Sequence, residues 1–228
     1  MRRVVLLLLL LQAVAVLKAQ DENEYLMEAG AGAGLVSYEG DLNGSIVSNM
    51  QPWGSLLVRR VITPYMALRG SIAYGKLKGD SRDVTTYYPA LQQEPVAFSH
   101  TLLDVSVTYE YNFWPYGTGR DYRGAKRCTP FIFGGVGATH VSGGPKNVTT
   151  ANIPLGLGVK YKLADRLNLG IEWAVHFSLS DKLDGVEDPY GFKSTGIFKN
   201  KDAYSALQLT LTYSFMPRCR TCHNADEN

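Results

Sequence analysis

Residues Tyr204–Phe215 read YSALQLTLTYSF and alternate between two kinds of side chain. Strand side chains point to opposite faces in turn, so one face of this segment is apolar with aromatics at its end, and the other is polar. A soluble sandwich could use one such strand, but many of them in one chain favour a barrel standing in lipid. We expect this segment to be the last strand and to pair with the first, which removes the last edge of the sheet.

The same alternation recurs along the chain and predicts eight strands of about 9–12 residues, the length that a tilted membrane strand requires. The expected strands cover residues 24–35, 55–62, 65–77, 98–113, 129–141, 153–163, 167–179 and 204–215. Thr63-Pro64 and Ala164–Arg166 make very short connections, whereas the loops at 78–97, 142–151 and 180–201 are longer. Bacterial barrels keep their short turns in the periplasm, so both chain ends are expected there. The predicted fold is all-β, an eight-stranded antiparallel transmembrane β-barrel.

The first residues have the pattern of a secretory signal peptide. Arg2 and Arg3 precede an apolar run, and Ala19 supplies a small residue for cleavage. This run is too short and wrongly flanked for a membrane helix. We therefore predict a signal peptide over residues 1–19, a barrel in the Gram-negative outer membrane over 20–216 and a periplasmic tail over 217–228.

Composition narrows the class of protein further. The chain has 228 residues, a net charge of +2 and 45% hydrophobic residues. The hydrophobic content excludes an intrinsically disordered chain, and the near-neutral charge gives no sign of nucleic-acid binding.

The inward faces of the predicted strands carry charges. An eight-stranded barrel has an interior only wide enough for side chains, and buried charges must pair or neutralise. The inward candidates are Glu28, Arg59, Arg69, Asp104, Glu110, Lys160, Lys162 and Glu172. We therefore predict a plug of paired charges and no pore. Arg60 is adjacent to Arg59, so one of the two must face lipid. The pattern leaves open which, although Arg60 could reach the headgroups from beside the Thr63-Pro64 turn.

Two patterns could carry chemistry, and each has a plainer explanation. His176 shares an inward face with Glu172 and Ser178, the residue types of acyl transfer, but such sets also arise by chance among polar lumen residues. The tail sequence from Cys219 to His223 matches the C-x-x-C-H pattern of haem attachment. Neither the tail nor a narrow lumen could bury a haem, so we predict no enzyme activity, no cofactor and no metal site.

Three cysteines in an exported chain leave one unpaired. Cys128 is expected at the periplasmic end of its strand, on the same side as Cys219 and Cys222 in the tail. One pair can close within the chain while the remaining thiol joins a partner. An intermolecular disulfide is therefore a hypothesis, and the connectivity stays open.

Several short segments, in this order, resemble one known family. They are Tyr38–Asn43 (YEGDLN), Thr63–Arg69 (TPYMALR), Tyr109–Tyr116 (YEYNFWPY), Thr129–Gly137 (TPFIFGGVG), Pro154–Glu172 and Asn200–Tyr204 (NKDAY). The chain is similar in these segments to the small outer-membrane barrels of the Bacteroidetes that serve the type IX secretion system. The resemblance covers most of the mature chain, and it implies no role for the cysteine-bearing tail.

The resemblance implies a non-enzymatic component of protein export that helps fix the periplasmic PorK/PorN ring to the outer membrane. Periplasmic surfaces would then carry the function. The basic residues Arg120, Arg123, Lys126 and Arg127 could steer an acidic partner surface, or lie beside lipid headgroups. Together with Cys128, Cys219 and Cys222 they form the expected partner-binding set.

The main alternative is a free-standing barrel whose long extracellular loops act in adhesion or other surface interactions. An enzyme ranks third among the functions considered. Deletion of residues 217–228 distinguishes the first two, because only the ring anchor should lose association with the ring.

Overall fold

The structure is a computed structural model that describes residues 25–39, 49–80, 97–117, 125–143, 147–179 and 203–217. Eight strands lie within these ranges. They are β1 (Tyr25–Glu39), β2 (Gln51–Thr63), β3 (Met66–Asp80), β4 (Ala97–Asn112), β5 (Cys128–Ser142), β6 (Val148–Ala164), β7 (Leu167–Ser178) and β8 (Ala203–Pro217).

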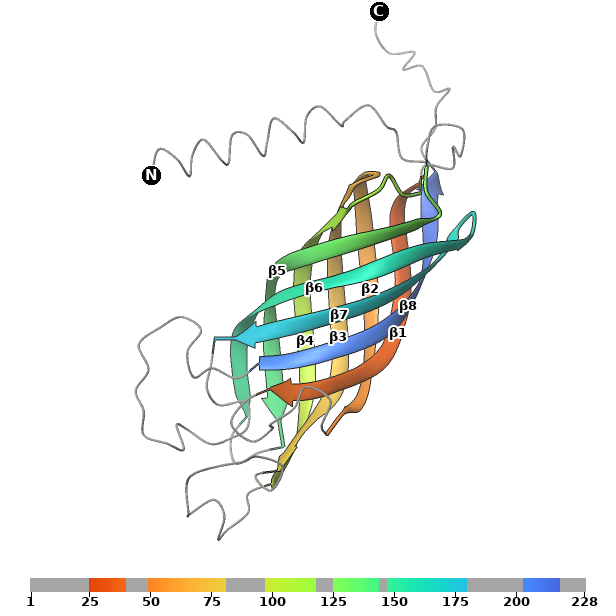
Figure 1. The fold of residues 1–228 in the computed structure, drawn as a ribbon. Helices are drawn as coiled ribbons and strands as arrows, with labels where there is room; N and C mark the ends of the chain where they lie inside the picture. Colours follow the sequence, from red (N-terminus) through yellow and green to blue (C-terminus); the bar gives the residue numbers. More distant parts are fainter. Residues whose placement is uncertain are drawn as a thin grey trace, which may run out of the picture.

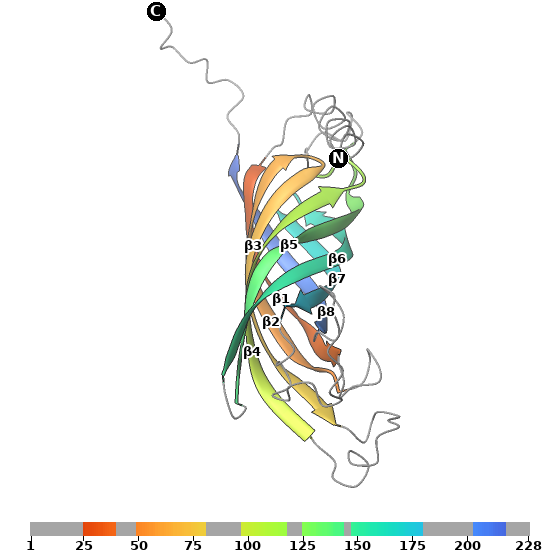
Figure 2. The same cartoon turned by 90° about the vertical axis from the view of Figure 1, so that its left-hand side faces the viewer.

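Each strand pairs antiparallel with its neighbours in sequence, and β8 pairs with β1 to close the barrel (Figures 1 and 2). The seam runs from Tyr25, opposite Pro217, to Glu39, opposite Ala203. The predicted fold and the predicted closing strand are therefore confirmed. A closed sheet has no free edge to pair with another chain.

The two faces of the barrel wall differ as the alternation predicts. Leu207, Leu209, Leu211 and Tyr213 of β8 point outward and are each about half exposed, whereas the alternating polar residues between them point into the lumen. The same division holds on the other strands, so the outer wall is mainly apolar. Among the described residues, no helix is both long and apolar enough to cross a membrane.

The connections sort into two ends, which we call the short-turn end and the long-loop end. The short-turn end holds the β2–β3 and β6–β7 turns, the 113–127 connection, the start of β1 and the end of β8. The strand ends that flank the other four connections lie at the opposite end of the barrel, the long-loop end (Figure 1).

Most strands are longer than predicted, and the eight range from 12 to 17 residues. The exceptions are β4, which has the predicted length, and β7, which ends one residue earlier than predicted. The largest difference is β6, which begins at Val148 and pairs there with Val141, so the predicted 142–151 loop shrinks to residues 143–147. Similarly, β2 begins at Gln51 and not at Ser55. The reason is that ladder hydrogen bonds continue beyond the alternating apolar band on which the prediction was based. The predicted signal peptide and most of the predicted tail lie outside the described residues.

Candidate functional site

The middle of the lumen is filled by a six-residue charge network with three carboxylates and three cations. Its members are Glu28 on β1, Arg59 on β2, Arg69 on β3, Glu110 on β4, Lys160 on β6 and Glu172 on β7. All six are buried, with Glu110 fully shielded from solvent. Buried charges are costly without partners. The equal numbers of acidic and basic side chains allow every charge in this network to be balanced inside the lumen.

Glu110 and Arg59 lie at the centre of this network. Arg59 Nε is 2.7 Å from Glu110 Oε2, and Arg59 Nη2 donates to Glu110 Oε1 at 3.1 Å. Arg59 also forms an ion pair with Glu28, and Lys160 Nζ donates to Glu110 Oε2 at 2.5 Å. One carboxylate therefore joins β4 to β2 and β6 across the lumen.

Arg69 extends the network toward β7. It is the direct cross-strand neighbour of Arg59, a pairing of like charges that is unfavourable without compensation. Compensation comes from Glu172 Oε2, 2.7 Å from Arg69 Nη1, and from Glu110 Oε1 at 3.3 Å. Two inward phenyl rings of β5 add cation–π contacts, with Phe133 4.3 Å from the Arg69 guanidinium carbon and Phe131 4.2 Å from Lys160 Nζ.

Asp104 was predicted to share this network, but it lies in a separate cluster nearer the long-loop end. Its Oδ2 accepts from Tyr204 Oη at 2.7 Å, Thr139 Oγ1 at 3.1 Å and Asn152 Nδ2 at 2.5 Å. His176 Nδ1 stands 3.7 Å from the same oxygen, and the His176 ring stacks on Tyr204 with centroids 4.5 Å apart. This Asp104 cluster ties together four strands besides β4.

Lys162 follows Lys160 on the inner face of β6 but lies nearer the short-turn end. It is half-buried and lines a small cavity of about 20 Å³, together with Glu28 and Asp165. A space of this size holds about one water molecule.

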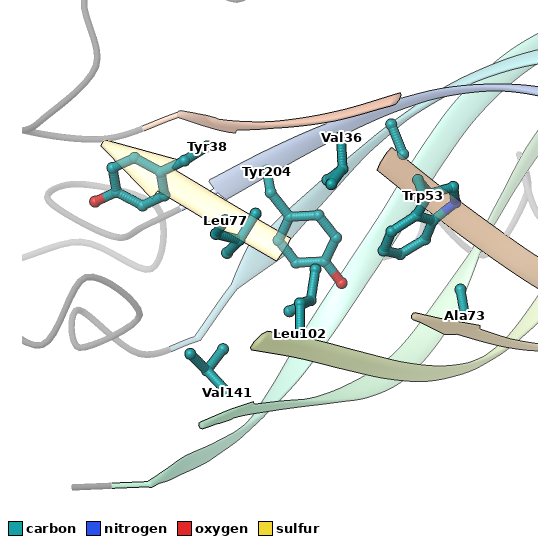
Figure 3. Close-up of a cluster of buried hydrophobic side chains, with 9 residues drawn as sticks. Val36, Tyr38, Trp53, Ala73, Leu77, Leu102, Val141 and Tyr204 are labelled. Carbon is teal, nitrogen blue, oxygen red and sulfur yellow. The ribbon is translucent and has the colours of Figure 1, made fainter. Parts of the chain in front are cut away.

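Both ends of the lumen are closed. At the long-loop end, inward apolar side chains from six strands pack into one cluster (Figure 3). Its labelled members are Val36, Tyr38, Trp53, Ala73, Leu77, Leu102, Val141 and Tyr204. At the short-turn end the 113–117 segment folds back over the mouth. The Tyr116 hydroxyl donates to Asn168 Oδ1 at 2.8 Å, and its N–H donates to the Pro64 carbonyl at 3.2 Å.

The residues proposed to bind a partner lie at the short-turn end, so far as they are described. Lys126 and Arg127 are exposed, and Cys128, the first residue of β5, is half-buried with a thiol outside any disulfide of the described residues. Arg120, Arg123, Cys219 and Cys222 lie outside the described residues. Arg59 points inward and Arg60 outward, which settles the ambiguity of that strand.

The possible catalytic set is not brought together. Glu172 is held by Arg69, whereas His176 faces Asp104 in the other cluster. Within the described ranges, no three residues of the His, Cys, Asp or Glu types are placed to hold a metal ion.

The fold and its interior define a class: a small, closed β-barrel whose lumen is plugged by side chains. The chain belongs to the family described as "Domain of unknown function (DUF6089)", which matches residues 2–224. No curated protein matches the sequence.

Solved structures of other barrels are similar in fold. Neisserial surface protein A (NspA) aligns with a TM-score of 0.51 and 12% identity, over 83% of this chain and 97% of that one. The outer membrane protein OprG from Pseudomonas aeruginosa aligns with a TM-score of 0.44 and 11% identity, over 85% of this chain and 97% of that one. At these identities the likeness concerns the fold alone.

Proposed function

We propose that this chain is a non-enzymatic component of the type IX protein secretion system in the outer membrane. There it anchors the periplasmic PorK/PorN ring, the role held by the barrel PorG. The observation that carries this proposal is the plugged lumen. A barrel filled with three acidic and three basic side chains and closed at both ends is suited to hold a position in the membrane, and not to conduct.

The outer wall supports membrane insertion. Only helices and closed barrels satisfy all backbone polar groups in lipid. Outward leucine, isoleucine and valine side chains form an apolar band, and aromatic residues gather toward the short-turn end, as expected at a membrane interface. These outward aromatics are Tyr109, Phe113, Trp114, Tyr161 and Tyr213.

The orientation follows from the connections. Short turns of bacterial barrels face the periplasm, which puts Lys126, Arg127 and Cys128 on the side of the ring. Exposed cations at this end offer a long-range attraction for an acidic partner surface. In the oxidising periplasm, the Cys128 thiol and a cysteine of the partner can be joined as a disulfide, the two electrons passing to the periplasmic oxidant.

The test is capture of PorK and PorN with the tagged full-length barrel from detergent-solubilised membranes, with and without reductant. The double variant Lys126→Gln/Arg127→Gln removes two positive charges from the short-turn end and should capture less ring at low salt. The difference from the unaltered chain should shrink at higher salt, which screens the attraction. The matched control, Asn147→Glu/Thr149→Glu, changes the net charge equally at exposed positions of the long-loop end and should capture normally.

Deletion of residues 218–228, which spares Pro217 because it is the last residue of β8, and Cys128→Ser separate the contributions of the tail and of the thiol. Under the proposal, the deletion weakens capture. If the intact barrel captures no ring protein under any of these conditions, the anchoring role is wrong, and a free-standing surface barrel takes its place.

A further inference from the structure

The outer wall over β2 and β3 has two hollows that the apolar band does not fill. One, of about 750 Å³, lies toward the long-loop end and is lined by Pro52, Gly54 and Tyr74, among others. The other, of about 510 Å³, lies nearer the middle and is lined by Val58, Gly70 and others. Both are bounded by Leu56 and Ile72, which pair directly across the strands and form a ridge between the hollows.

Two outward glycines leave these hollows open. A Cβ added at Gly70 would meet nothing within 4 Å, and one at Gly54 would meet only the Gly32 carbonyl oxygen at 4.0 Å. The inward Gly75 differs, because its Cβ would lie 2.8 Å from the Trp53 ring. Interior packing therefore does not require glycine at positions 54 and 70, and the absence of side chains there keeps the two hollows open.

The outward residues of β3 change character in order along the strand. Gly70 and Ile72 border the hollows, Tyr74 follows, and Lys76 and Lys78 come last, both exposed. Aromatic residues favour the membrane interface, and a lysine facing lipid is cheap only near the headgroups. Lys76 and Lys78 thus lie where headgroups begin, and Lys76 also lines the hollow that is nearer the long-loop end.

The neighbouring strand adds polar groups at the same level. Lys76 pairs with Thr101 and Lys78 with Ser99, which share the outward parity of β4. Two ammonium groups flanked by hydroxyl side chains fit a phosphate, and apolar hollows directly below them fit acyl chains.

We propose that the outer wall of β2 and β3 binds a specific membrane lipid with a phosphorylated headgroup, its phosphate at Lys76 and Lys78 and its acyl chains in the hollows on either side of Leu56 and Ile72. This inference rests on the membrane location in the proposed function, but not on ring anchoring. The proposed lipid site lies on the outer wall of the barrel and is separate from the sealed lumen.

Native mass spectrometry of the detergent-purified full chain tests the proposal, with lipid A as the probe. Diacylglycerol probes the hollows for acyl chains alone, and inorganic phosphate probes the lysine site alone. We expect one lipid A to be retained, diacylglycerol to bind more weakly and free phosphate not to be retained. Retention of free phosphate alone, or equal affinity for lipid A and diacylglycerol, would contradict the proposal.

Two double variants address the two halves of the site. Gly54→Leu/Gly70→Leu fills the hollows and should abolish selective retention, whereas Ala138→Leu, at an exposed outward position of β5, should not. Lys76→Gln/Lys78→Gln should lower affinity for lipid A about fivefold per lysine, whereas the outward Arg60→Gln should leave it unchanged. Heat-dependent mobility on gels verifies that each variant is folded. Because Lys76 and Lys78 are exposed, Lys76→Gln/Lys78→Gln should fold normally. It therefore tests the lipid site even if Gly54→Leu/Gly70→Leu does not fold.

The outcomes separate this inference from the proposed function. If both double variants retain lipid A as their controls do, the lipid site is wrong, and ring capture is unaffected. If the chain does not float with liposomes, the membrane location itself fails.

Discussion

Arg59 on β2 and Glu110 on β4 meet inside the lumen, with Arg59 Nε 2.7 Å from Glu110 Oε2, although the two strands are not neighbours in the sheet. Both residues are buried. The contact therefore joins two strands that are separated by β3 and share no backbone hydrogen bond. It makes the interior, and not only the ladder, a determinant of barrel stability.

Replacing Glu110 should be among the most destabilising single changes in the barrel. Glu110→Gln leaves the cations Arg59, Arg69 and Lys160 facing only two carboxylates. Breaking a buried ion pair by removing one partner costs about 3–5 kcal/mol. The measurement is urea unfolding in detergent micelles, followed by intrinsic fluorescence.

The charge balance itself can be tested with the same assay. Glu110→Gln combined with Lys160→Met restores equal numbers of both signs and should recover most of the stability. Arg60→Gln, which removes an outward cation, should change the unfolding free energy by about 0.5 kcal/mol or less. A double variant less stable than Glu110→Gln alone would show that charge balance does not govern the network.

Asp104 should matter through its hydrogen bonds and not through an ion pair with the central network. Asp104→Ala removes the acceptor that the buried donors Tyr204, Thr139 and Asn152 share and leaves them only one another as partners, at a cost of about 1–3 kcal/mol. Asp104→Asn keeps an acceptor oxygen and should lose less. Equal losses for the two variants in the unfolding assay would contradict this account.

The sequence predicts the wall of the barrel better than its contents. Alternation on β7 and β8 is unambiguous because large apolar residues mark every second position, and the structure has the same parity. On β5 the glycines carry no side chain to mark a face, so the inward placement of Phe131 and Phe133 was not predicted. Alternation says which residues face inward, but the stagger between strands decides which of them meet.

The site shows the same limit. Asp104 and Glu110 lie on one face of one strand, yet six residues of rise separate them into two clusters. Tyr116 was missed because it belongs to a connection, and no periodicity marks a loop residue that folds back into a lumen. The signal that could have identified Tyr116 lies in Tyr109–Tyr116 (YEYNFWPY), where aromatic residues continue beyond the alternating apolar and polar residues of the strand.

The seam between β1 and β8 should tolerate no side chain at Gly34. A Cβ there would collide with the backbone carbonyl oxygen of Leu207, which cannot move without breaking the ladder. Gly34→Ala should therefore fail to give the folded, heat-modifiable form on gels. Gly70→Ala makes the same chemical change at a β3 position with open space and should fold normally. Normal folding of both variants would mean that the seam is looser than this geometry requires.

The plugged lumen should not conduct ions. The apolar cluster closes the long-loop end, the charge network fills the middle, and Tyr116 covers the short-turn end. In planar bilayers the full chain should show no steps above background, while a porin reconstituted in parallel does. Tyr116→Ala opens only one of three successive barriers, so it should stay silent as well. Steady conductance in Tyr116→Ala but not in the unaltered chain would mean that the 113–117 segment is a gate over an open path, and that the network of Arg59 and Glu110 leaves room for ions beside it.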